Sequence, residues 1–455
     1  MPRAWQAGQM AWAARAWLCA AALAISCATP MARAQSAAPA PAPVPADILD
    51  RQAQALLPLL NGAGDPAALF TPEFRAAVPE AQLRDILRQL SASMGKALSV
   101  AGIDRVHPRA GTVRFQYEGG LVLARLVVDE AAPYRVMGLL ITGTSHPAAD
   151  LPALAGAFAA LPGLTSFGVY RLSEGAPQML AARDGDAALA VGSAFKLLIL
   201  AELVRATNVG ERHWDDMVTL NGAALPGGLY TRKPAGTQVS LRELAEKMIA
   251  VSDNSATDIL LNLVGRRRVE AMMDVIGLPN AARNRPMMGT LDMFKLKGVE
   301  DGLLARHYLA QDEAGRRSLL DHEIAAIPLS AIKPDLFQDS EPLLVAEVEW
   351  FFSPADLARI MDWLRRNSAG GPGAEVRRIL SINPGISPAA KEGFGYVGYK
   401  GGSEPGVINM TLLLQDRQGR WDVVTASWND TARDIDKGRF TAMMNRAAEL
   451  AATLP

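Results

Sequence analysis

Cysteine and histidine are scarce in this chain of 455 residues. The only two cysteines, Cys19 and Cys27, lie near the N-terminus, and the five histidines form neither an H-x-H nor an H-E-x-x-H pattern. Without thiols after residue 34, the rest of the chain has no disulfide and no cysteine-based metal site. Scattered histidines also argue against a zinc hydrolase. We therefore expect chemistry that needs no metal and no other cofactor.

The sequence also lacks an excess of charge of either sign. It has 46 Lys and Arg residues against 47 Asp and Glu residues, a formal net charge of −1. A nucleic-acid-binding domain would need a basic face with interleaved aromatic residues, and no such segment is present. We expect no nucleic acid as a partner.

The apolar run at residues 16–28, "AWLCAAALAISCA", is too short to span a bilayer comfortably. Two arginines precede it, and "ARA" at 32–34 supplies an A-x-A cleavage site, as in a secretory signal. We predict a signal peptide over residues 1–34, no stable membrane insertion after its removal, and export to the periplasm or beyond. A lipid anchor at Cys27 is not favoured, because "AISC" has alanine where a lipoprotein signal favours leucine.

Three further regions follow the signal. Residues 35–46, "QSAAPAPAPVPA", have the composition of an extended Pro/Ala linker. Residues 47–145 show helical periodicity and then strand-like alternation, which predicts a small α+β domain of cystatin-like or NTF2-like type. Residues 150–455 begin and end with a helix, and strands lie near both ends with helices between them. This order predicts one mainly antiparallel sheet flanked by helices.

The chain contains three Ser-x-x-Lys patterns, at residues 93–96, 193–196 and 330–333. Residues three apart share a helix face, so each lysine amine could lie beside the serine hydroxyl. Only Ser193 follows a glycine and begins an apolar helix, where free backbone N–H groups and the helix dipole favour developing negative charge. The setting favours Ser193 as an activated nucleophile, with Lys196 as its base.

Two more motifs lie downstream. Ser252 begins "SDN" within "VSDNSATD", and Lys400 lies in strand-like "GYKGGSEPG", followed by two glycines that let a ligand approach the backbone. Alone, "SDN" is typical of a helix cap and Lys400 of a solvated strand residue. "GGSEP" starts like the G-x-S-x-G of Ser-His-Asp hydrolases but ends in Pro405, so that class is not favoured.

Ser-x-x-Lys, Ser-Asp-Asn and Lys-x-Gly in this order resemble the motifs of class A β-lactamases and penicillin-binding proteins, over about residues 150–455. The resemblance implies a small-molecule substrate, a β-lactam or a peptidoglycan-like amide or ester. Ser193 would attack its carbonyl and form an acyl-enzyme. Lys196 would help to remove its proton, and Ser252 would relay a proton to the leaving nitrogen. The implied substrate-binding residues are Asn254, Lys400, Gly402 and Ser403.

The same resemblance implies finer roles. Asn254 would bind the substrate amide, and Lys400 would attract a substrate carboxylate. Burial or the charge of Lys400 would lower the pKa of Lys196. The backbone N–H groups of Ser193 and Ser403 would form the oxyanion hole.

Two features depart from the family. Gly401 stands where a hydroxyl residue usually follows the lysine, so a donor for the substrate carboxylate is lost unless Ser403 supplies one. The loop glutamate of the E-x-x-L-N pattern, which activates the deacylating water, is also absent from the long segment 280–352. Glu341 in "SEPLLV" is the nearest candidate, but Val345 stands where asparagine belongs. We therefore expect slow deacylation.

The two-domain plan also resembles a group of β-lactamase-like proteins that carry a small isomerase-like or cystatin-like domain before the serine domain. One of these comes from a clavulanic-acid biosynthesis cluster, and the resemblance implies an accessory role for residues 47–145. The function expected is an exported serine hydrolase with weak β-lactamase activity. A penicillin-binding peptidase or esterase and a β-lactam sensor without turnover remain alternatives.

Overall fold

The computed structural model describes residues 47–338 and 340–455. The predicted signal peptide and linker lie outside the described residues. The described chain forms two compact units. The first unit comprises the described residues up to Pro147 together with the short segment Gly438–Ala442. The second comprises Ala148–Lys437 and Met443–Pro455.

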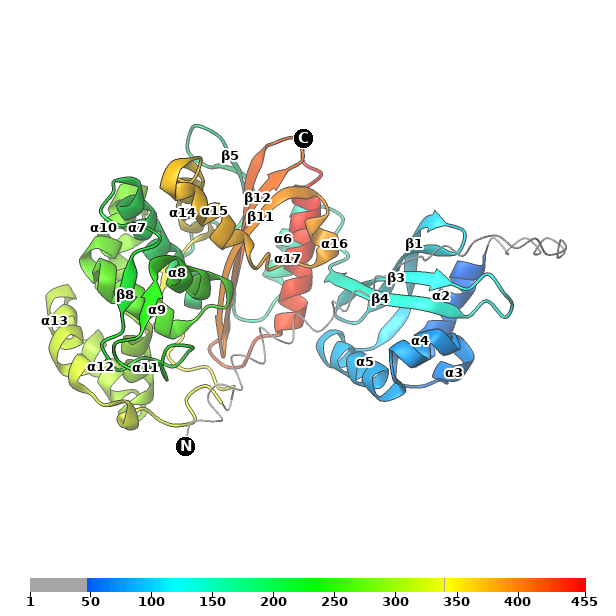
Figure 1. Cartoon of the computed structure of the whole chain (residues 1–455), viewed down its shortest axis with the longest axis horizontal. Helices are drawn as coiled ribbons and strands as arrows, with labels where there is room; N and C mark the ends of the chain where they lie inside the picture. Colours follow the sequence, from blue (N-terminus) through cyan, green and yellow to red (C-terminus); the bar gives the residue numbers. More distant parts are fainter. Residues whose placement is uncertain (1–46, 339) are drawn as a thin grey trace. The chain divides into compact units, whose positions relative to one another are not determined.

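The first unit consists of helices followed by an antiparallel meander, the order that its periodicity predicts (Figure 1). Its elements are α2 (Ile48–Leu60), α3 (Pro66–Leu69), α4 (Pro72–Ala77), α5 (Glu80–Met94), β1 (Ala97–His107), β2 (Ala110–Tyr117), β3 (Gly120–Val128) and β4 (Val136–Ser145). Alternate residues of β2 are buried, among them Phe115 and Tyr117, and they pack with Leu49 and Leu56 of α2. The unit therefore has its own apolar core.

The second unit is built on a five-stranded antiparallel sheet in the order β11-β12-β13-β5-β6, so strands from both ends of the region pair directly. Its longer strands are β5 (Leu164–Leu172), β6 (Gln178–Arg183), β11 (Phe394–Glu404), β12 (Val407–Asp416) and β13 (Trp421–Asn429). The short strands are β7 (Leu189–Ala190), β8 (Met217–Thr219), β9 (Gln238–Ser240) and β10 (Phe351–Phe352). The predicted class, a mainly antiparallel sheet flanked by helices, is confirmed.

Helices cover both faces of this sheet (Figure 1). α6 and α17 lie on one side, and α7 and α14 lie on the other. The principal helices are α6 (Leu151–Ala159), α7 (Lys196–Asn208), α8 (Leu241–Ala250), α9 (Asn254–Val264), α10 (Arg266–Ile276), α11 (Thr290–Gly298), α12 (Leu303–Leu309), α13 (Glu313–Ser318), α14 (Pro354–Arg366), α15 (Ala374–Ser381), α16 (Pro388–Lys391) and α17 (Lys437–Ala451).

The centre of the second unit is α7, whose residues are nearly all buried. A short 3₁₀ turn, η1 (Gly192–Phe195), leads into it beside β11, which is an edge strand of the sheet. An edge strand next to a helix start leaves backbone groups available to a ligand. None of the helices in the described part of the chain is both long and apolar enough to cross a bilayer.

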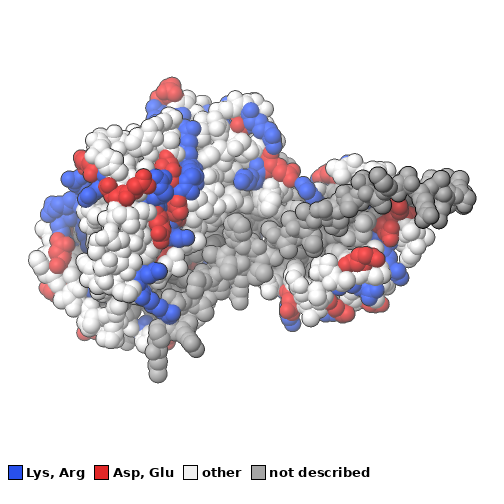
Figure 2. Space-filling view, viewed as in Figure 1, with Lys and Arg blue, Asp and Glu red and all other residues white. Residues whose placement is uncertain are grey.

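The described surface carries charges of both signs. On the face drawn in Figure 2, basic and acidic side chains are interspersed, and neither sign covers a large area. This agrees with the formal net charge of −1.

Candidate active site

Ser193 lies in the 3₁₀ turn η1 and Lys196 is the first residue of α7. A 3₁₀ helix has three residues per turn, so side chains three apart lie on the same side of it. Ser193 is half-buried, and Lys196 is 0% exposed. The turn packs tightly on β11, because a Cβ on Gly402 would lie 2.2 Å from the backbone nitrogen of Ser193. Only glycine fits at position 402.

The amine of Lys196 is held by the "SDN" segment. Its Nζ donates to the carbonyl oxygen of Ser252 at 2.8 Å, to Ser252 Oγ at 3.2 Å and to Asn254 Oδ1 at 2.8 Å. No hydrogen bond joins it to the Ser193 hydroxyl among the residues that the structure describes. The amine is therefore fixed on the side of the turn where Ser252 lies.

The Ser252 hydroxyl lies between two buried amines. Lys400 Nζ on β11 donates to Ser252 Oγ at 3.1 Å and also to the carbonyl oxygen of Gly401. Ser252 has a φ of 58°, a left-handed conformation that costs a non-glycine residue about 1–3 kcal/mol. The structure thus brings together the three motifs that are far apart in the sequence.

Burial changes the protonation of both amines. It lowers the pKa of Lys196 to about 7, although Asp253 and Asp258 act in the opposite direction. Burial also lowers the pKa of Lys400 well below its ordinary value, and the charge of Lys196 lowers it further. Repulsion between two charges is mutual, so protonation of one amine disfavours protonation of the other. Burial, more than the charge of Lys400, accounts for the lowered pKa of Lys196.

Two aspartates near the amines have structural roles. Asp253 caps α9 by accepting from the backbone nitrogen of Ala256 at 2.8 Å, and it also accepts from that of Leu229 at 2.7 Å. Asp258 accepts from the first two backbone N–H groups of α11, and burial raises its pKa to about 6. The cap expected from "SDN" alone is present, together with the contact to Lys196.

The hydroxyl of Tyr399 occupies the space beside Gly401, the position at which the resemblance places a hydroxyl residue. Residues 399 and 401 share one face of β11. A Cβ on Gly401 would lie 2.2 Å from the Tyr399 Oη and 2.8 Å from the carbonyl oxygen of Asn409. Position 401 therefore has no room for a side chain. Ser403, two residues further along, is exposed on the same face.

The segment before β10 supplies a buried acid that the sequence patterns did not indicate. Glu341 is exposed, whereas Glu349 is 2% exposed, and the adjacent Trp350 stacks on Phe195 with ring centroids 3.8 Å apart. Glu349 Oε1 accepts from Lys297 Nζ at 3.3 Å, and its Oε2 accepts from the backbone nitrogen of Trp350 at 3.1 Å. A lone acid in the apolar run "VEWFF" was the available signal.

The other two Ser-x-x-Lys patterns lie at the surface. Ser93 is exposed and donates to the carbonyl oxygen of Leu90 at 3.0 Å, one helical turn back. Ser330 is exposed, and Lys333 is paired loosely with Asp335 at 3.9 Å. Neither lysine is buried, so neither shares the environment of Lys196.

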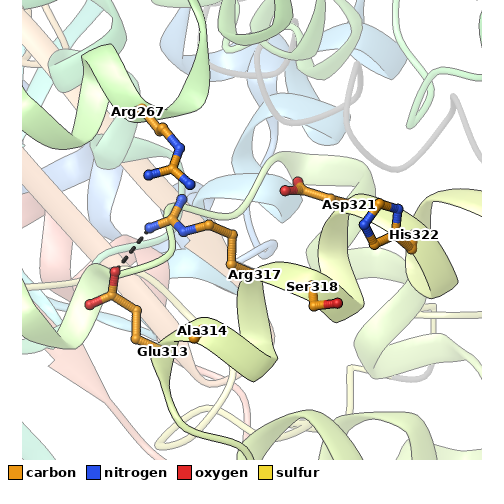
Figure 3. Close-up of a pocket in the computed structure, with 7 residues that line it drawn as sticks. All are labelled: Arg267, Glu313, Ala314, Arg317, Ser318, Asp321 and His322. Carbon is orange, nitrogen blue, oxygen red and sulfur yellow. Dashed lines mark hydrogen bonds and ion pairs between the residues drawn. The ribbon is translucent and has the colours of Figure 1, made fainter.

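A separate surface pocket lies near α13 (Figure 3). It is lined by Arg267, Glu313, Ala314, Arg317, Ser318, Asp321 and His322. None of the site residues predicted from the sequence lines this pocket.

Residues 150–378 match the model of a family described as the β-lactamase enzyme family, which is half of the chain. The chain belongs to the β-lactamase enzyme family. The matched residues include the Ser193 and Ser252 motifs, and Lys400 lies beyond them. The family predicted from the three motifs is therefore confirmed.

No curated protein matches the chain. Similar solved structures include a β-lactamase from Sphaerobacter thermophilus, with 21% identity over 67% of this chain and 97% of that chain, at a TM-score of 0.45. The penicillin-binding protein PBP-A has 16% identity over 66% of this chain and 94% of its own, at a TM-score of 0.45. A β-lactamase from Chitinophaga pinensis has 14% identity over 66% and 96%, at a TM-score of 0.43.

Proposed function

We propose that this member of the family is a serine hydrolase that forms an acyl-enzyme on Ser193 with a β-lactam or a related amide or ester. One observation carries the proposal: the Ser252 hydroxyl lies between two buried amines, at 3.2 Å from Lys196 Nζ and 3.1 Å from Lys400 Nζ. Two buried amines without a hydrogen-bonded carboxylate are costly for stability, and this favours a catalytic use.

In the acylation step, the neutral amine of Lys196 accepts the proton of Ser193, and Ser193 Oγ bonds to the substrate carbonyl carbon. The carbon–nitrogen bond breaks, and the leaving nitrogen takes a proton through Ser252 Oγ. The ester of Ser193 remains. The negative charge on the carbonyl oxygen is stabilised by the backbone N–H groups of Ser193 and Ser403, which lie at the contact between η1 and β11.

We assign a substrate carboxylate to the place beside Gly401. The Lys400 amine reaches the Gly401 carbonyl, the Tyr399 hydroxyl fills the space beside Gly401, and Ser403 lies further along the same strand face. A bound carboxylate raises the pKa of Lys400 and restores its charge. Tyr399 then supplies the hydroxyl donor that is missing at position 401. Asn254, which already accepts from Lys196, would bind the substrate amide.

Deacylation is expected to be slow. Glu349 is buried and directly precedes Trp350, which stacks on Phe195. Its two carboxylate oxygens already accept hydrogen bonds, one from Lys297 and one from the Trp350 backbone nitrogen. A carboxylate that is engaged in this way is poorly placed to activate a water. The adduct should accumulate, so a penicillin-binding protein that is acylated once is the second candidate function.

Export to the periplasm or beyond is part of the proposal and rests on the composition of residues 1–34. Mass spectrometry of the secreted protein would locate its N-terminus. We expect a start close to residue 35, and a mature chain that begins at Met1 would contradict export by cleavage.

Two parallel assays test the function. Labelling with a fluorescent penicillin measures acylation, and hydrolysis of a chromogenic cephalosporin measures turnover. We expect stoichiometric labelling with slow hydrolysis that follows a burst. Labelling without any hydrolysis would favour the second candidate, a penicillin-binding protein that is acylated once. Absence of both labelling and hydrolysis would contradict the proposal.

A further inference from the structure

A second buried charge cluster lies beside the Ser193 turn, and no step proposed above uses it. The side chains of Lys297 on α11, Glu349 before β10 and Glu404 at the end of β11 are 0%, 0% and 7% exposed. Lys297 Nζ lies 3.3 Å from Glu349 Oε1 and also pairs with Glu404 Oε1. Three segments that are distant in the sequence therefore meet at one ammonium group.

The cluster contains two carboxyl groups but only one amine. With all three groups ionised, a net charge of −1 would be buried, which is strongly unfavourable. Both oxygens of Glu349 have partners, whereas the buried Oε2 of Glu404 has no hydrogen-bond partner among the described residues. A proton on Glu404 makes the cluster neutral.

The pKa directions agree with this count. Burial, and then the neighbouring Glu349, raise the pKa of Glu404 well above its ordinary value. Burial alone would lower the pKa of Lys297, but the two carboxyls raise it. Glu349 and Lys297 are the titratable groups that act most strongly on Glu404, and the uncharged ring of Phe337 lies 5.7 Å from Lys297 Nζ.

The cluster joins the two sides of the nucleophile's turn. On one side, Trp350 follows Glu349, and the carbonyl oxygen of Trp350 accepts from the backbone nitrogen of Val191 at 2.9 Å. On the other side, Ser403 precedes Glu404, and its backbone nitrogen lies 3.1 Å from the place that a Cβ on Gly192 would take. A shift of Glu404 would therefore move the Ser403 N–H relative to Ser193.

We propose that the cluster of Lys297, Glu349 and Glu404 positions the Ser403 N–H for the oxyanion, and that it does so only while Glu404 carries a proton. The inference rests on the proposed function, because it takes Ser403 as an oxyanion donor. When Glu404 ionises, it repels Glu349 and adds negative charge close to the developing oxyanion. Glu404 is thus a positioning residue that makes acylation sensitive to alkaline pH.

Glu404→Gln gives the cluster a neutral, isosteric side chain that has no proton to lose. We expect the acylation rate of the wild type to fall about tenfold per pH unit above the pKa of Glu404, while the rate of the variant stays level. Stopped-flow acylation by a penicillin between about pH 7 and pH 10 measures this. Coincident pH profiles would overturn the positioning role.

Unfolding tests the proton separately from activity. A carboxyl whose pKa is raised by folding stabilises the protein below its unfolded pKa, and this stability is lost as pH rises towards the folded pKa. Between the unfolded and the folded pKa of Glu404, the unfolding constant of the wild type should therefore increase about tenfold more per pH unit than that of Glu404→Gln. Parallel pH dependences would overturn the proton assignment. A wild type that shows this difference but is never acylated would contradict the proposed function alone.

Lys297→Met removes the cation that joins the two acids. We expect an acylation rate constant about 10²-fold lower, as when one oxyanion donor is lost, with substrate affinity unchanged within about twofold. Glu270→Gln is the control, because it breaks another largely buried pair of the same unit, with Arg317 at 2.8 Å. A loss of affinity without a loss of rate, or an equal rate loss in the control, would overturn the inference. If Lys297→Met does not fold, the Glu404→Gln profiles decide.

Discussion

Lys196 and Lys297 are both fully buried lysines in the same unit, yet their pKa values move in opposite directions. Lys196 donates to a backbone carbonyl, a hydroxyl and an amide oxygen, and its pKa falls to about 7. Lys297 pairs with two carboxyls, and its pKa rises. Burial is common to both, so the partners decide which lysine can act as a base at neutral pH.

The strand β11 carries one member of each cluster. Lys400 belongs to the cluster with an excess of amines, and Glu404, four residues later, belongs to the cluster with an excess of acids. Burial lowers the pKa of both amines in the first cluster, whereas in the second cluster it raises the pKa of Glu404. The contrast separates a site arranged for proton transfer from one arranged to hold a fixed geometry, and the following predictions test it.

The largest effect is expected from Lys196→Met. Removal of a general base typically lowers a rate about 10²–10⁴-fold, and we expect a loss of this size in acylation. Lys295→Met is the matched control, because Lys295 is 3% exposed and donates to two backbone carbonyls at 2.9 and 3.0 Å. Rapid-quench kinetics with a penicillin compares them. Equal losses in both variants would show that any buried lysine matters.

The two lysines should also differ in their effect on stability. Lys297→Met leaves two buried acids without their cation, and loss of one partner of a buried pair costs about 3–5 kcal/mol. Lys196→Met removes an amine that has no hydrogen-bonded carboxylate, so we expect the free energy of unfolding to change by less than about 1 kcal/mol, or to increase. Urea denaturation of both variants at pH 7 measures the difference. A similar cost for the two would remove the contrast.

The pH dependence of acylation should follow Lys196. Its amine must be neutral to accept a proton, and its pKa is about 7. The acylation rate should therefore fall about tenfold for each pH unit below pH 7, and level off above it until Glu404 begins to ionise. Single-turnover labelling at pH values below and above 7 measures this fall in the acylation rate. A rate that is level down to about pH 5 would exclude Lys196 as the base.

A smaller effect is expected from Tyr399→Phe, which removes only the hydroxyl beside Gly401. A hydrogen bond to a charged group is worth about 1.5–3 kcal/mol, so acylation by a penicillin should fall at least about tenfold. Acylation by the methyl ester of the same penicillin should change little. Tyr396→Phe is the control on the same strand, because its hydroxyl donates to the Arg377 carbonyl at 2.9 Å. An equal loss for acid and ester would place Tyr399 outside the carboxylate site.

Short local patterns were enough to single out the candidate residues that the fold brings together. Ser193 and Lys196 are three residues apart at a helix start, and the motifs of Ser252 and Lys400 have a recognisable order, so each could be predicted from a short stretch. The cluster of Lys297, Glu349 and Glu404 could not be predicted, because its members come from three segments that only the fold brings together.

The Tyr399 hydroxyl beside Gly401 shows a finer limit. Strand alternation places residues 399 and 401 on one face, but it does not show that a phenol ring lies along the strand and fills the space over Gly401. The helices within residues 280–352 likewise do not follow from the E-x-x-L-N loop pattern of the family. Their cores are short and are stabilised by packing in the large apolar cluster.

The central claim is that the environment, not the Ser-x-x-Lys spacing, makes Ser193 the nucleophile. Intact-protein mass spectrometry after penicillin treatment tests it most directly, with Ser193→Ala compared with Ser93→Ala and Ser330→Ala. The account predicts a mass increase of one penicillin in the wild type and in both control variants, and none in Ser193→Ala. An adduct on Ser193→Ala, or its loss in either control, would contradict the claim.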